Sequence, residues 1–488
     1  MSLRKKTIKG IIWSSAESWG TQATQLLTFL VLARLLNPET FGLVSMSNVF
    51  IHFVLSVLNF GFSEAIIQRQ DLESKHLNTA FWTNVGLGCF LTILGVSLAG
   101  TVADFFSEPQ LVPIIQWLSL NILIRSFVAI QEAIQRRELL FKNLAVRQLI
   151  GVLAGCIAGL IMAVSGFGVW SLVVQTLLTS TVAMILLWKI SSWRPQIEFS
   201  IQHFKELFSF GSSVIGINIL MFFNLRSDDL LIGYFLGPVS LGYYTVAYKL
   251  LVTLNQLIAE AVRKVAMPAF SKLQSEPKKM QEAFYKASRL MSFLSLPLYF
   301  SAAILAPEIV LALFGTEWLP SVPVMQVLAF VGIFRAVADL VGPVIMAVGK
   351  PLWNLYLLIA ASITKVVAFL IFVHWGIVST AVGLLVAVVL IMPVRLSTLF
   401  TLIGAQWKSY VAQFILPFLS SFAMSATALL TKALVGHFLG GDLIFSEETQ
   451  AYITIGLCLG LGGVAYVGTI RLLDPAIFKR ALKFSGRS

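Results

Sequence analysis

Long apolar runs separated by short polar segments dominate the chain. An α-helix needs about 20 mostly apolar residues to cross the hydrocarbon core of a bilayer, and about fourteen runs reach that length. The runs are continuous and lack the alternation over about ten residues that is typical of barrel strands, so the pattern predicts helices. The predicted spans are residues 11–36, 40–62, 79–103, 111–132, 144–165, 168–190, 207–235, 240–263, 288–313, 321–347, 352–373, 377–400, 408–435 and 450–473.

Two motifs of the first half of the chain reappear in the second half. Leu36-Asn37-Pro38, followed by Gly42, matches Leu236-Gly237-Pro238, followed by Gly242. Further along, Pro113, Gln116, Leu118 and Arg125 match Pro323, Gln326, Leu328 and Arg335. Because six spans precede the second half, both halves enter from the same side, so the repeat is parallel. Paired membrane halves of this kind are typical of secondary transporters.

These features predict an all-α, polytopic membrane bundle of about fourteen helices, built from two six-helix lobes and a final helix pair. The predicted divisions are residues 1–200, 201–400 and 401–488. Composition supports this class: 57% of the residues are hydrophobic and only 12% are charged, against roughly 25% charged residues in soluble domains.

The basic residues also predict an orientation. If the N-terminus is cytoplasmic, about 27 of the 35 lysines and arginines lie in cytoplasmic segments, as the positive-inside rule expects. An even number of spans returns the C-terminus to the same side. Most of the net charge of +12 then lies at the cytoplasmic membrane surface, where it faces anionic lipid headgroups. We therefore expect no nucleic-acid partner.

Ionisable residues within predicted spans are the candidate functional groups, because charges at membrane depth are costly and usually face a cavity or a partner. Arg226 and Asp229 are three positions apart, and Arg335 and Asp339 are four apart, so each pair can form a salt bridge on one helix face. For these pairs a structural role and a substrate contact are equal alternatives. Six deep basic residues are Arg125, Arg226, Lys249, Arg335, Lys365 and Arg395.

The balance of these charges favours an anionic cargo. Six deep basic residues stand against the four acids Glu17, Asp228, Asp229 and Asp339, and phosphates are the usual partners of arginine and lysine. Arg125, Lys249, Lys365 and Arg395 have no acid three or four positions away, so their counter-charge comes from another helix, from water in a cavity or from the ligand. We favour a cavity for the first three, which lie deeper, and for Arg395 a side chain that reaches the cytoplasmic interface. Glu17 and Asp339 are candidates for ion coupling, although a structural role is the more common one for such acids. We expect no metal site and no cofactor.

Several segments resemble bacterial polysaccharide exporters of the multidrug/oligosaccharidyl-lipid/polysaccharide flippase superfamily. The strongest resemblance lies in the run from Asp229 to Pro238 and its continuation to Leu250. Residues 33–43 are similar to the first hairpin of that family, and residues 305–318 to the exit of its ninth span. The resemblance covers nearly the whole chain and is greatest for exporters of lipopolysaccharide, O-antigen and colanic acid.

The resemblance implies a flippase for surface polysaccharide biosynthesis. Such a protein moves an oligosaccharide linked to undecaprenyl diphosphate across the cytoplasmic (inner) membrane by alternating access, and it is a transporter and not an enzyme. The diphosphate would meet Arg125, Arg226, Lys249, Arg335 or Lys365, and the partners would be membrane lipids, a polysaccharide polymerase and a chain-length regulator.

Two other functions remain as alternatives. One is an ion-coupled multidrug antiporter of the same superfamily. The other is a membrane polysaccharide polymerase or ligase, which the sequence favours least because the predicted outer loops are short and acidic and carry no catalytic constellation.

Overall fold

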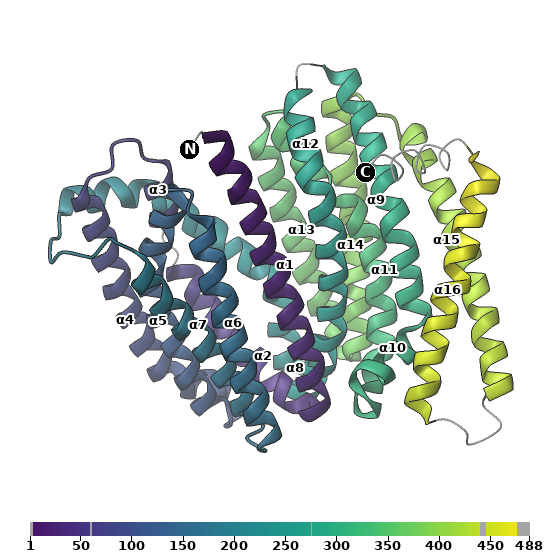
Figure 1. Ribbon diagram of the computed structural model, residues 1–488, viewed down its shortest axis with the longest axis horizontal. Coiled ribbons are helices and arrows are strands. Elements are labelled where there is room, and N and C mark those ends of the chain that lie inside the picture. Colours follow the sequence, from purple (N-terminus) through teal and green to yellow (C-terminus); the bar gives the residue numbers. More distant parts are fainter. Residues whose placement is uncertain (1–2, 59–60, 275, 440–445, 476–488) are drawn as a thin grey trace. The chain divides into compact units, whose positions relative to one another are not determined.

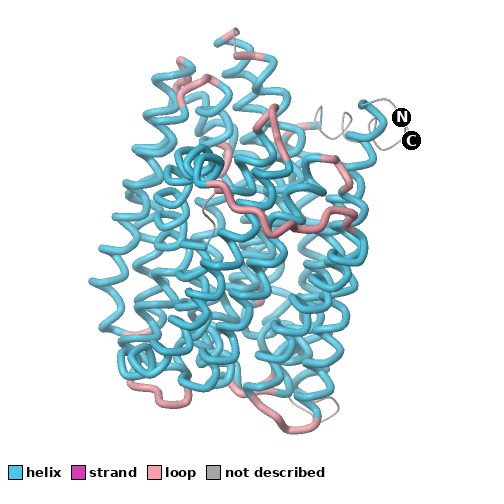
Figure 2. Tube along the Cα trace, turned by 90° about the vertical axis from the view of Figure 1, so that its left-hand side faces the viewer, coloured by secondary structure: helices cyan, strands magenta, loops and turns pink. Residues whose placement is uncertain are grey.

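Helices make up all of the regular secondary structure in the residues that the computed structural model describes, which are 3–58, 61–274, 276–439 and 446–475 (Figures 1 and 2). The helices are α1 (Leu3–Leu35), α2 (Pro38–Leu58), α3 (Phe62–Gln68), α4 (Ser74–Phe106), α5 (Leu111–Arg137), α6 (Phe141–Val164), α7 (Val169–Ile190), α8 (Ile201–Lys272), α9 (Pro277–Ile304), α10 (Ala306–Phe314), α11 (Val322–Ala338), α12 (Val341–Ala347), α13 (Pro351–Phe372), α14 (Ile377–Ile403), α15 (Trp407–Leu439) and α16 (Glu447–Leu473). Two short 3₁₀ helices, η1 (Thr316–Ser321) and η2 (Val373–Trp375), complete the described elements. The predicted all-α class is confirmed.

The predicted number of spans agrees with these helices. Within the described residues, twelve segments are long and apolar enough to cross a membrane. One of them, 216–256, contains a break at Gly237 (φ 79°, ψ 179°). Glycine adopts positive φ readily and the following Pro238 has no amide hydrogen, so the helical hydrogen bonding is interrupted there. This segment therefore overlaps both predicted spans 207–235 and 240–263, and α1 is the remaining predicted span.

The chain forms two compact units, Met1–Gly242 and Tyr243–Ser488. In the first unit α6 packs against α1 and α7, and α4 packs against α5 (Figure 1). In the second unit α9 contacts α11 and α15, α11 contacts α14, and α15 pairs with α16. The divisions expected at residues 200 and 400 remain a prediction. The basic tail after residue 475 lies outside the described residues.

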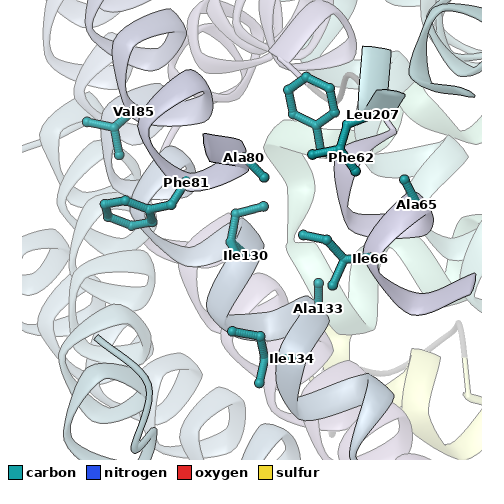
Figure 3. Packing of buried hydrophobic residues seen from close by; sticks show 10 residues of the cluster. All are labelled: Phe62, Ala65, Ile66, Ala80, Phe81, Val85, Ile130, Ala133, Ile134 and Leu207. Carbon is teal, nitrogen blue, oxygen red and sulfur yellow. The ribbon is translucent and has the colours of Figure 1, made fainter. Parts of the chain in front are cut away.

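A buried hydrophobic cluster joins four helices at one end of the first unit (Figure 3). Phe62 and Ile66 of α3, Phe81 of α4 and Ile130 of α5 pack together with Leu207, which lies near the start of α8. The cluster therefore fixes the start of α8 against α3, α4 and α5.

The two copies of the repeated turn lie against each other inside the first unit. A Cβ atom added at Gly42 would lie 1.8 Å from the carbonyl oxygen of Pro238. A Cβ atom added at Gly242 would lie 2.0 Å from the carbonyl oxygen of Pro38. All four residues are buried. Each glycine is therefore required because the backbone of the other copy occupies the space of a side chain.

Candidate functional site

A cavity of about 620 Å³ lies in the first unit, between residues of α2, α3, α4, α5 and α8. Its lining is mixed and contains leucine and phenylalanine side chains as well as ionisable and amide side chains. The polar residues that matter for charge are His52, Glu64, Arg125, Glu132, Arg136 and Arg226. Two of the predicted substrate contacts, Arg125 and Arg226, are thus brought to one cavity.

One face of α5 supplies three of these charges. Arg125, Glu132 and Arg136 are seven and four positions apart, a spacing that places side chains on one side of a helix. Arg125 is exposed to the cavity and makes no hydrogen bond or ion pair with another residue that the structure describes. Its guanidinium group is therefore available to a ligand.

Glu132, on the same face of α5, forms ion pairs with two arginines. Its carboxylate lies 2.7 Å from Arg136 Nη2 and 3.0 Å from Arg147 Nη2 on α6. Arg147 is almost fully buried, with a side-chain exposure of 5%. Glu17 of α1, which we identified as a candidate for ion coupling, interacts electrostatically with this group. A cluster of two acids and two arginines thus connects α1, α5 and α6.

Arg226 already forms an ion pair with an acid of its own helix. Its Nη1 atom lies 2.9 Å from Asp229 Oδ2, across the spacing of three residues noted in the sequence. His52 interacts electrostatically with Arg226 and Arg125. Of the two arginines at this end of the cavity, Arg226 has a paired acid and Arg125 forms no ion pair with a residue that the structure describes.

The remaining predicted site residues lie in the second unit. Arg335 Nη1 donates to Tyr248 Oη at 3.4 Å, and Asn255 Nδ2 donates to Asp339 Oδ2 at 3.2 Å. Arg395 interacts electrostatically with both Asp339 and Arg335, so these three charges form one group.

The two predicted lysines of the second unit lie on different helices. Lys365 is buried, with 8% of its surface exposed, and its Nζ lies 5.2 Å from the centre of the Phe369 ring. Lys249 is half-buried on α8. That these residues contact the substrate remains a prediction.

Among the lining residues that were not predicted for a site are His52, Glu132 and Arg136. The spacing from Arg125 along α5 was a usable signal for Glu132 and Arg136. No local signal pointed to Arg147 as the partner of Glu132, because the two lie on different helices.

A family model described as "Polysaccharide biosynthesis protein" matches residues 31–323, which is more than half of the chain. The chain belongs to this polysaccharide biosynthesis protein family. The resemblance noted in the sequence is thereby confirmed at the level of the family. The matched range includes the cavity and both copies of the repeated turn.

Curated relatives of this polysaccharide biosynthesis protein match over nearly its whole length. The lipopolysaccharide biosynthesis protein WzxC of Escherichia coli is 26% identical over 446 residues, which covers 91% of this chain and 90% of WzxC. The succinoglycan biosynthesis transport protein ExoT of Rhizobium meliloti is 25% identical over 484 residues, which covers 98% of this chain and 95% of ExoT.

Solved structures share the fold. The inward closed conformation of the lipid II flippase MurJ aligns with a TM-score of 0.77 at 16% identity, covering 97% of this chain and 99% of MurJ. An inward-facing multidrug resistance transporter of the MATE family aligns with a TM-score of 0.59 at 18% identity, covering 80% and 98%. The chain is therefore a multi-pass helical membrane protein with the fold found in these transporters.

Proposed function

We propose that the protein is a flippase that moves a polyprenyl-diphosphate-linked oligosaccharide across the cytoplasmic membrane during surface polysaccharide biosynthesis. The observation that carries the proposal is Arg125, which lines the cavity of a polysaccharide biosynthesis protein and has no hydrogen-bond or ion-pair partner among the described residues. Its relatives support the same activity, since one is named for lipopolysaccharide biosynthesis and another for succinoglycan transport.

The cavity suits the polar part of such a lipid. A guanidinium group binds phosphate through two parallel charge-assisted hydrogen bonds, and Arg125 can offer both without losing another partner. The volume of about 620 Å³ lies within the range that holds a headgroup of drug size, so the diphosphate and its first sugar enter while the polyprenyl chain stays in the lipid. Arg226 adds positive charge from α8.

Coupling of alternating access to an ion gradient needs a group that gains or loses an ion, for which the group of Glu17, Glu132 and Arg147 is the candidate. A carboxylate that gains or loses a proton there changes the charge balance between α1, α5 and α6. In the second unit, we propose the same role in ion coupling for Asp339. The termini are cytoplasmic in this scheme, and a polymerase and a chain-length regulator act on the product after transfer.

The test is translocation of a short undecaprenyl-diphosphate oligosaccharide in proteoliposomes that contain the purified chain. Hydrogen bonds to a charged group contribute about 1.5–3 kcal/mol, which corresponds to roughly a 10- to 150-fold change in affinity. We expect Arg125→Ala to weaken transport at subsaturating substrate by that factor and Arg125→Lys to recover part of it.

Arg136→Ala is the matched comparison, because Arg136 lines the same cavity but is already bonded to Glu132. Arg136→Ala should lower the thermal stability more than Arg125→Ala does, and it should lower the affinity for the lipid-linked substrate less. Transport unchanged in Arg125→Ala would refute the assigned contact. A wild-type protein that fails to move the lipid and instead exports a cationic dye would refute the flippase and favour the antiporter.

A further inference from the structure

Two histidines and two glutamates meet at the end of the first unit where α4 and α8 begin. His203 Nε2 lies 3.5 Å from Glu73 Oε2, and His76 Nε2 lies 3.3 Å from Glu206 Oε2. The two imidazole rings are 4.2 Å apart and perpendicular. One ligand atom each from Glu73, His76 and His203 lies within 4.8 Å of the others.

From this arrangement we infer that Glu73, His76 and His203 bind a divalent transition metal ion, with zinc as the best match. Imidazole nitrogen and carboxylate oxygen are the donors that zinc takes alongside cysteine, whereas calcium and magnesium prefer oxygen ligands alone. At bond lengths of 2.0–2.1 Å, ligand atoms around a tetrahedral zinc are about 3.4 Å apart. The separation of 3.5 Å between Glu73 and His203 already has that value.

The surrounding hydrogen bonds orient both imidazoles as in known metal sites. The Nε2 atom of His76 faces Glu206, which also accepts a hydrogen bond from Arg69. Because Nδ1 of His76 accepts from the backbone N–H of Glu73, the proton of the neutral ring is on Nε2, where Glu206 accepts it. A metal-bound histidine almost always donates its other N–H to such a partner.

This orientation turns one ring nitrogen of each histidine toward Glu73. Nδ1 of His76 accepts a hydrogen bond of 3.2 Å from the backbone N–H of Glu73, which is part of the capping box at the start of α4, so an ion would bind there in place of that hydrogen bond. Nδ1 of His203 lies 2.6 Å from Ser200 Oγ, which leaves Nε2 facing Glu73. Three protein ligands leave the fourth position to water, and the exposed Glu73 side chain provides the route of entry.

The backbone around the cluster is held in place without an ion. The backbone N–H of Gln196 donates to Asn78 Oδ1 at 3.1 Å, and that of Ser200 donates to Thr79 Oγ1 at 3.1 Å. Leu207 belongs to the hydrophobic cluster that contains Ala80 and Phe81 of α4, so it fixes the start of α8 against α4 (Figure 3). The backbone that carries His76 and His203 is therefore already in place, and their ligand atoms lie within 4.8 Å of each other and of Glu73. A bound ion would connect the first turns of α4 and α8 directly.

Zinc binding by the purified full-length chain tests the inference. The affinity tag is removed, the protein is treated with a chelator, and zinc ion is titrated in competition with a fluorescent indicator. We expect one equivalent of zinc per chain, affinity at least tenfold weaker in His76→Ala and in His203→Ala, and affinity about tenfold weaker in Glu206→Gln, which removes an outer partner only. Cobalt ion in place of zinc should give the strong visible absorption of a tetrahedral site.

His437→Ala is the matched control, because His437 is exposed on α15 in the other unit. It should bind zinc as the wild type does. A wild-type chain without saturable zinc binding would overturn the inference, and that measurement does not depend on whether any variant folds. Binding that persists in the His76→Ala/His203→Ala double variant would also overturn it. In either case Glu73, His76, His203 and Glu206 form only a hydrogen-bonded network.

Discussion

The close contact between the two repeated turns makes a quantitative prediction for Gly42→Ala. The new methyl group would lie 1.8 Å from the carbonyl oxygen of Pro238, and ordinary contact starts at 3.4 Å, so the two backbones would have to separate by about 1.6 Å. The obstacle is backbone and not a flexible side chain. We therefore take the upper end of the cost of overpacking, about 3 kcal/mol.

Gly100→Ala is the matched control. Gly100 also lies inside a helix, α4, but a Cβ atom added there meets nothing within 4 Å. Both substitutions gain the same helical preference of alanine over glycine, about 0.5–1 kcal/mol. The difference in the free energy of unfolding between the two variants therefore reports the steric cost alone, and we expect about 3 kcal/mol. Equilibrium unfolding in mixed micelles, followed by tryptophan fluorescence, measures it.

A second variant tests whether the contact is reciprocal. Gly242→Ala places a methyl group 2.0 Å from the Pro38 carbonyl oxygen and should cost nearly as much. If one separation of the turns relieves both overlaps, the double variant should be more stable than the sum of the single effects predicts, by at least about 1 kcal/mol. Strict additivity, or a Gly42→Ala variant as stable as Gly100→Ala, would refute the reasoning.

One ion pair and one hydrogen-bonded arginine outside the cavity give further predictions. Lys432 Nζ lies 2.8 Å from Glu308 Oε1, and the Glu308 side chain is only 14% exposed; Lys432→Met should therefore lower the free energy of unfolding by about 1–2 kcal/mol, while Lys408→Met in the same helix should not. Arg137 donates to three backbone carbonyl groups at and just after the C-terminal end of α3. Since lysine lacks the planar fork of arginine, Arg137→Lys should speed trypsin cleavage in the link between α3 and α4 at least threefold, and an unchanged rate would contradict this role.

The sequence predicts the helical class and most spans because hydrophobicity decides them. Runs of about 20 apolar residues have few alternatives in a bilayer, and turns such as Gly237-Pro238 mark where a run divides. The Arg226–Asp229 contact follows similarly from local spacing, since a separation of three residues fixes two side chains on one helix face.

Contacts between distant segments are what the sequence does not reveal. Arg147 lies on a helix other than that of Glu132, and His76 is 130 positions from Glu206. Their meeting depends on helix packing, which no local spacing encodes. For the same reason the charge count of the spans singled out Arg125 but omitted Glu132, whose carboxylate forms ion pairs with Arg136 and Arg147.

The reciprocal turns also bear on how such a chain can change over evolutionary time. Residue 42 touches residue 238 while residue 242 touches residue 38, which is the pattern of an isologous interface between two identical subunits. Here the two partners belong to one polypeptide, as expected if a gene for a symmetric dimer was duplicated and fused. A bulkier residue in one turn can then be tolerated only with a compensating change in the other. Among related sequences, positions 38 and 42 should therefore vary together with positions 238 and 242.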